Sequence, residues 1–72
     1  MNLAELSRGS TGVVADVIGP RELTSRLLEM GLTTGTKLRV VRHAPLGDPI
    51  EVEVRGYRLS LRRDEARSVT LA

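Results

Sequence analysis

The sequence predicts a small, mainly β domain in which about five short strands form a strongly bent barrel, with one α-helix inserted at about Pro20 to Met30. Short segments that alternate apolar and polar residues, or that are rich in β-branched residues, indicate the strands. A single segment has the apolar spacing of an amphipathic helix. The length of 72 residues and the mass of 7.9 kDa allow one domain, residues 1–72, and exclude the larger α/β folds.

The N-terminal segment is expected to form one turn and one strand. Leu3 and Leu6 lie three residues apart, which suits a helical or 3₁₀ turn that ends at Gly9. Residues 10–12, Ser-Thr-Gly, are typical of a turn. Residues 13–18 are rich in β-branched side chains and predict a strand. Both faces of that strand have apolar residues, so the buried face stays open.

Residues 20–30 have the clearest helical pattern. Pro20 can occupy the first helical position, where its missing N–H does no harm. Leu23, Leu27 and Met30 recur on one face of this helix, and Leu28 widens the apolar stripe that they form. Gly31 suits the left-handed residue that ends a helix, and Leu32 can then fold back onto Leu27 in a Schellman motif.

The C-terminal half is expected to supply the remaining strands. Residues 37–43 predict a strand. Residues 44–49 contain two prolines and a glycine, which predict a stiff, irregular loop. Residues 63–66 are expected to form a helical turn, and residues 68–71 predict a closing strand.

Residues 50–61 predict a hairpin whose register is specified by its side chains. With a two-residue turn at Arg55-Gly56, every apolar residue of one strand meets an apolar residue of the other. Glu53 then meets Arg58, and a slip of one residue would destroy both matches. The expected pairs are Val54–Tyr57, Glu53–Arg58, Val52–Leu59 and Ile50–Leu61.

The reactive side chains argue against an enzyme and against a cofactor or metal site. Because the chain has no Cys, no thiolate can bind a metal or act as a nucleophile. His43 is the only histidine, and we interpret it as a solvent-facing residue at a strand end, with a weak metal contact as the alternative. Glu51 and Glu53 share one strand face, where nearby arginines favour a solvated charged surface over a catalytic pair. The motifs of a phosphate-binding loop and of a nucleophile elbow are missing.

The charge pattern favours solvated ion pairs, or a docking surface for an acidic protein, over binding a nucleic acid. Ten Arg and one Lys exceed nine acidic residues, which gives a net charge of +2 and a pI of about 9.9. The arginines are interspersed with acidic residues, and Tyr57, the only aromatic residue, is expected to point inward, so a platform for base stacking is missing. We expect a cytoplasmic protein, because no segment is long and apolar enough to cross a membrane and the N-terminus lacks a secretory signal.

The segment Ala44–Pro49, called loop 44–49 below, is the most unusual stretch. Two prolines restrict it, so it loses little conformational entropy when it binds a partner. Leu46 at its centre has no periodic apolar partner. Two interpretations stay open: Leu46 closes the open end of the barrel, or the loop presents a surface.

Together these segments resemble the FeoA family of small bacterial proteins. The resemblance rests mainly on a helix end and a loop at this spacing: Arg26-Leu27-Leu28-Glu29-Met30-Gly31-Leu32 and Ala44-Pro45-Leu46-Gly47-Asp48-Pro49-Ile50. It covers essentially the whole chain through further matches at Gly35, Val40-Val41-Arg42, Val54-Arg55-Gly56-Tyr57, Leu59-Ser60-Leu61-Arg62 and Glu65-Ala66.

The resemblance implies an SH3-like β-barrel with an inserted helix. It also implies a role in ferrous iron uptake, as a cytoplasmic accessory of FeoB, a membrane transporter whose cytosolic part binds GTP. The candidate partner-binding residues are then Arg26, Met30, Gly31, Leu46, Gly47, Asp48 and Pro49.

FeoA-like domains also occur at the C-terminus of iron-dependent repressors, which suggests an alternative. The chain could be a regulatory module of a metal-dependent repressor, or a small barrel that binds nucleic acid. Because it starts with its own Met1 and lacks a helix-turn-helix, the free-standing accessory is favoured, with contact to the membrane only through the transporter.

Overall fold

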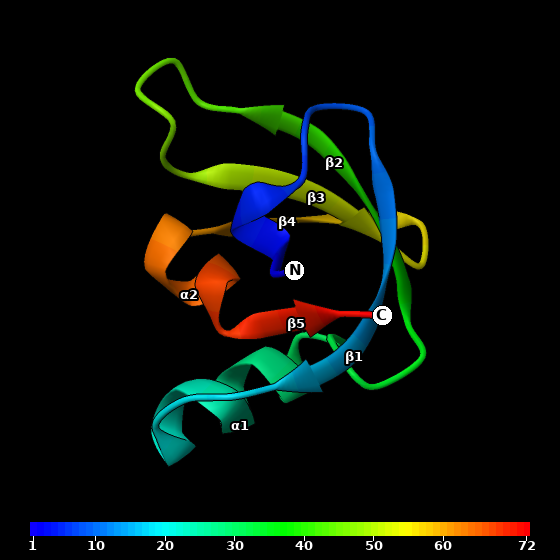
Figure 1. Cartoon of the computed structure of the whole chain (residues 1–72), viewed down its shortest axis with the longest axis vertical. Helices are drawn as coiled ribbons and strands as arrows, with labels where there is room; N and C mark the ends of the chain where they lie inside the picture. The colour runs from blue at the N-terminus through cyan, green and yellow to red at the C-terminus, as the bar shows by residue number, and fades with distance from the viewer.

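Five antiparallel strands form one sheet in the order β4-β3-β2-β1-β5 (Figure 1). The computed structural model describes residues 1–72. The strands are β1 (Thr11–Val17), β2 (Lys37–His43), β3 (Ile50–Val54), β4 (Tyr57–Leu61) and β5 (Val69–Leu71). A 3₁₀ turn, η1 (Leu3–Glu5), and two helices, α1 (Arg21–Glu29) and α2 (Arg63–Arg67), complete the chain. The mainly β class with about five strands and one inserted helix is confirmed. No helix has the length and apolar character needed to span a bilayer.

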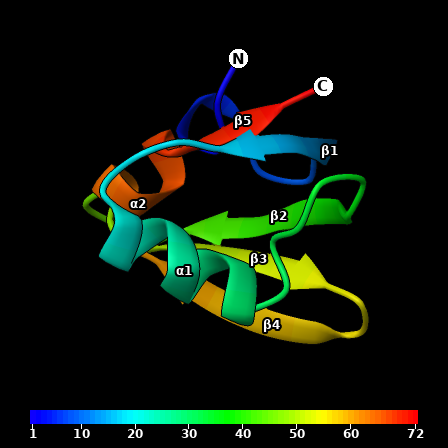
Figure 2. The same ribbon diagram turned by 90° about the horizontal axis from the view of Figure 1, so that it is seen from below.

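The sheet bends because β1 changes its partner along its length. Residues 11–13 pair with β2, whereas residues 14–17 pair with β5. The register shifts between Val14 and Asp16, where one extra residue on β1 forms a bulge, and bulges bend strands. The curled sheet is not closed by a further pairing, so β4 and β5 remain as its two edges. Figure 2 shows the strands in this order from β5 to β4.

The predicted turn at residues 10–12 was wrong for its last two residues, because Thr11 and Gly12 begin β1. A Cβ at Gly12 would lie 3.1 Å from Leu71 Cδ1 and 3.3 Å from Leu6 Cδ1. The glycine therefore serves a close approach of side chains over a strand and not a turn. On β1 the buried side chain is that of Val14, which settles the face that the sequence left open.

The C-terminal end of α1 is the predicted Schellman motif. The N–H of Leu32 donates to the carbonyl of Leu27 at 3.1 Å, and that of Gly31 donates to the carbonyl of Leu28 at 3.0 Å. Gly31 has a φ of 101°, in the left-handed region. Pro20 lies just before the first helical residue and not within the helix.

The predicted apolar stripe of α1 was wrong at Leu28. Leu27 is fully buried, and Leu23 and Met30 pack against the core. Leu28 is 45% exposed and is not among the residues packed against the core. The helix therefore contacts the sheet through a narrower stripe than the sequence suggested.

The register of the β3–β4 hairpin is confirmed at every expected pair. Arg55 and Gly56 have φ values of 49° and 85°, as a type I′ turn requires. The ion pair of Glu53 is made with Arg39 of β2, at 3.2 Å, and not with Arg58. Tyr57 was wrongly expected to point inward, since it is 42% exposed.

The core is aliphatic, as the composition requires. Fifteen buried apolar residues form one cluster: Leu3, Ala4, Leu6, Val14, Leu27, Leu32, Leu38, Val40, Ile50, Val52, Val54, Leu61, Ala66, Val69 and Leu71. They lie in the predicted N-terminal turn, in α1 and just after it, in α2, and in each of the five strands. The curled sheet thus packs around a core that consists only of Ala, Val, Leu and Ile side chains.

Candidate docking surface

Loop 44–49 connects β2 to β3 and is held by its own hydrogen bonds. The N–H of Gly47 donates to the carbonyl of Ala44 at 2.7 Å, which closes a turn, and Gly47 has a φ of 85°. The N–H of Ala44 donates to the carbonyl of Pro49 at 3.0 Å, which joins the two ends of the loop. The loop is therefore an ordered projection of the sheet and not a slack connection.

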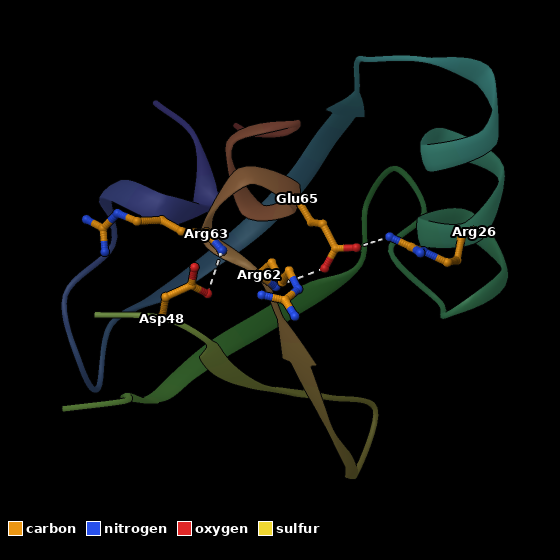
Figure 3. Close-up of polar contacts among 5 residues, drawn as sticks. All are labelled: Arg26, Asp48, Arg62, Arg63 and Glu65. Carbon is orange, nitrogen blue, oxygen red and sulfur yellow. Dashed lines mark hydrogen bonds and ion pairs between the residues drawn. The ribbon is translucent and has the colours of Figure 1, made fainter. Parts of the chain in front are cut away.

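Two residues of loop 44–49 are hydrogen-bonded to α2, and Figure 3 shows the contact made by Asp48. The backbone N–H of Arg63 donates to Asp48 Oδ1 at 3.1 Å, so the carboxylate satisfies one of the N–H groups that the start of a helix leaves unpaired. The side chain of Arg63 donates from Nη1 to the carbonyl of Gly47 at 3.0 Å. Asp48 and Gly47 thus position the loop.

Leu46 lies at the tip of this fastened loop and is 96% exposed. It therefore does not close the end of the barrel, which was one of the two interpretations left open by the sequence, and the presented surface stays a prediction. The exposed apolar surface of this leucine is unfavourable in water, and a partner that covers it would remove that surface from water.

The other candidate residues lie at the end of α1. Tyr57 donates a hydrogen bond from its hydroxyl to the carbonyl of Met30, which ties β4 to this helix end. The same hydroxyl lies too close to Gly31 to leave room for a Cβ there unless the tyrosine moves. Gly31 therefore suits both the left-handed backbone and the close approach of Tyr57.

Arg26 projects from α1 toward α2 and pairs with Glu65 (Figure 3). The other oxygen of that carboxylate, Oε1, accepts the backbone N–H of Arg62 at 2.8 Å. Glu65 therefore joins the two helices. Arg26 thus forms an ion pair within the chain, although 59% of its side chain remains exposed.

The structure does not bring the candidate residues into one patch. Loop 44–49 lies at one end of the longest axis of the molecule and α1 at the other, with α2 between them (Figure 1). Both parts are linked to α2, through Arg63 and through Glu65. The sequence-based grouping thus separates into a loop part and a helix part.

The sequence interpretation missed the two residues of α2 that join these parts. Glu65 had a usable signal, because a glutamate three positions after the N-cap residue can accept the N-cap N–H, which is the glutamate half of a capping box. Arg63 had none, since its partners Gly47 and Asp48 lie fifteen or more residues away and outside any strand pairing.

The remaining polar residues singled out by sequence are paired within the chain. His43 is half-buried, and its Nε2 lies 3.0 Å from the carbonyl oxygen of Leu6, so it does not face solvent freely as expected. Glu51 accepts from Arg42 Nε at 2.6 Å. No three His, Asp or Glu side chains gather in a group that could hold a metal ion.

A prediction follows for the contact at the helix end. Gly31→Ala and Gly35→Ala both place a Cβ on a left-handed glycine, but only Gly31 faces Tyr57, since Gly35 has open space. We expect Gly31→Ala to lower the free energy of unfolding by about 1 kcal/mol more than Gly35→Ala, because the tyrosine must give up its hydrogen bond. Urea unfolding of the two variants, alone and combined with Tyr57→Phe, measures this. If the difference persists when Tyr57 is phenylalanine, the hydrogen bond is not its cause.

Comparison with known proteins places the whole chain in one family. The model of the family described as FeoA domain matches residues 1–72. The chain is 39% identical over 69 residues to the "Fe(2+) transport protein A/Fe(2+) transporter FeoB fusion protein" of Porphyromonas gingivalis. That match covers 96% of this chain but only 8% of the fusion protein.

Solved structures share the fold. The solution structure of the FeoA protein of Chlorobium tepidum has a TM-score of 0.92 and 45% identity, and the match covers 99% of this chain and 68% of that one. The FeoA protein of Stenotrophomonas maltophilia, a zinc complex described as a prokaryotic SH3 domain protein, has a TM-score of 0.88 and 33% identity, covering 100% and 89%. The expected SH3-like fold is thus confirmed. A manganese-dependent transcriptional repressor, at 20% identity and a TM-score of 0.92, shares the fold alone.

Proposed function

The chain belongs to the FeoA family, and we propose that it is a cytoplasmic accessory protein of ferrous iron uptake that binds the cytosolic part of a FeoB-type membrane transporter. The proposal assigns the chain a binding role and no reaction. It would reach the membrane only through the transporter.

The fusion protein of Porphyromonas gingivalis supports a functional association of the two components. It unites transport protein A and the transporter FeoB in one polypeptide, and this chain matches the smaller part. Two proteins that are fused in one organism are close neighbours there, at a high effective concentration. In an organism where the two are separate chains, they would have to bind each other to come equally close.

The observation that supports the docking role best is the exposure of Leu46 on a fastened loop. Burial of one leucine side chain is worth about 1.5–3 kcal/mol. Because loop 44–49 is already ordered by its turn and by Arg63, little conformational entropy is lost when it binds. Leu46, Gly47, Asp48 and Pro49 therefore form the first part of the proposed surface.

The end of α1 is proposed as the second part of the surface. Met30 and Gly31 lie beside Tyr57, whose half-exposed ring adds apolar area. Arg26 can keep its ion pair to Glu65 and still contact a partner, because much of its side chain is exposed. A partner that touches both parts would have to reach across α2.

Co-purification tests the proposal. The full chain is mixed with the purified cytosolic domain of the transporter from the same organism, with and without guanine nucleotide, and the mixture is separated by size. We expect the two proteins to elute together in at least one nucleotide state. Separate elution in every nucleotide state, at concentrations up to the solubility of both proteins, would contradict the proposal.

A further inference from the structure

The outer edge of β4 is a second surface, distinct from loop 44–49. The sheet has two edge strands, β4 and β5. The edge of β5 is short and partly covered, because the N–H of Leu71 donates to the carbonyl of Met1 at 2.9 Å and Asn2 forms a bridge with Thr70. No segment of the chain pairs with the outer edge of β4, which is the lowest strand in Figure 2.

The backbone of this edge has unpaired groups at Arg58 and Ser60. In a hairpin with a two-residue turn, the pair next to the turn is hydrogen-bonded, and the bonded pairs then alternate along the strands. Tyr57, Leu59 and Leu61 are therefore bonded to β3. The N–H and C=O groups of Arg58 and Ser60 point the other way, and they form no hydrogen bond in turns, loops or side-chain contacts.

The side chains along the edge are cationic and lack partners. Arg58, Ser60 and Arg62 are all exposed. The side chains of Arg58 and Arg62 form no ion pair, whereas the other arginines over this sheet, Arg39 and Arg42, are bound to Glu53 and Glu51. The edge thus combines free backbone donors and acceptors with two arginines that form no ion pair, although Glu53 lies opposite Arg58 on β3.

We propose that β4 accepts an acidic, extended segment of another protein as an added strand. Such a segment supplies backbone groups for Arg58 and Ser60 and carboxylates for Arg58 and Arg62, which is strand addition with charge complementarity. The inference does not depend on the role proposed for loop 44–49.

The same features disfavour two other occupants. A second copy paired through β4 would place the arginines of both copies on the same face of the joined sheet, where like charges destabilise the pairing. Charge alone would also suit the phosphates of a nucleic acid. However, phosphate oxygens only accept hydrogen bonds, whereas the edge presents carbonyls as well as N–H groups.

Titration of the isotope-labelled full chain with a synthetic peptide tests this inference. The probe is a blocked peptide of alternating Glu and Val, and its controls replace every Glu by Lys or methylate every backbone nitrogen. We expect amide shifts centred on residues 57–62 and slower hydrogen exchange at Arg58 and Ser60. Each control peptide should bind about tenfold or more weakly.

A charge-reversed variant makes the test independent of peptide behaviour. The double variant Arg58→Glu, Arg62→Glu should no longer bind the Glu peptide and should instead bind the Lys peptide. Arg8→Glu combined with Arg21→Glu, which changes the net charge equally at exposed arginines without ion pairs, should behave as the unmodified chain. Thermal unfolding of both variants confirms that they are folded. The inference is overturned if the Glu peptide causes no shifts, if the methylated peptide binds equally well, or if a short oligouridylate competes equally for the same residues.

Discussion

Leu27→Ala is expected to lower the free energy of unfolding by about 2–5 kcal/mol, the range for truncating a buried leucine. Leu27 is fully buried and is the only buried residue of α1. Its carbonyl also accepts the N–H of Leu32 in the Schellman motif, so the side chain and the helix end are fixed together. A domain of this length has a total stability of about 4–11 kcal/mol at typical values per residue. The loss is therefore a large part of the total.

Leu28→Ala is the matched control, because it removes the same atoms from the neighbouring position. Leu28 is half-exposed, so its truncation should cost about 1 kcal/mol or less. Urea unfolding followed by far-ultraviolet circular dichroism gives both values, provided that the slope with denaturant is unchanged. Equal costs for the two variants would show that α1 does not anchor to the sheet through Leu27.

Leu46→Asp is expected to abolish transporter-dependent ferrous iron uptake while the fold stays intact. The side chain is almost fully exposed, so a polar replacement should change the stability of the isolated chain by no more than about 0.5 kcal/mol. At a docking interface, the same change would bury an unpaired charge in place of an apolar anchor, which costs several kcal/mol. Uptake of labelled ferrous iron, in cells whose only copy of the gene encodes the variant, measures the effect.

Two controls make this result specific to the loop. Ile18→Asp introduces the same charge at another exposed apolar residue, in the connection between β1 and α1, and should leave uptake unchanged. Immunoblotting of the transporter excludes a change in its abundance. Normal uptake by Leu46→Asp at normal transporter abundance removes loop 44–49 from the docking surface.

The parts of the fold that the sequence predicts well are those that depend on local patterns. The β3–β4 hairpin is fixed by the agreement of three apolar pairs with one two-residue turn, and a slip would place Val52 on the wrong face. The end of α1 follows from Gly31, because few residues adopt a left-handed backbone at low cost. In both cases neighbours in sequence determine the structure.

The parts that sequence patterns do not predict depend on contacts between distant segments. Gly12 has the neighbours of a turn residue, but it lies within a strand, where the side chains of Leu6 and Leu71 pack closely against it. Leu28 fits the helical stripe, yet the curled sheet contacts a narrower face. The attachment of loop 44–49 to α2 depends on Arg63, and no periodicity connects Arg63 to Asp48.

The candidate site shows the same division. The exposure of Leu46 is consistent with a residue that has no periodic apolar partner, and the stiffness of its loop is consistent with two prolines. That the loop and the end of α1 lie on opposite sides of α2 is a property of the three-dimensional arrangement (Figure 1). The loop is therefore the part of the proposed surface that can be tested alone.

Amide mapping tests the central claim most directly. The isotope-labelled chain is titrated with the unlabelled cytosolic domain of the transporter, in the nucleotide state that gives the tightest complex. The account predicts that the amide signals of Leu46, Gly47 and Asp48 shift or broaden most. Signals of the loop that stay unchanged while another face of the chain responds would contradict it.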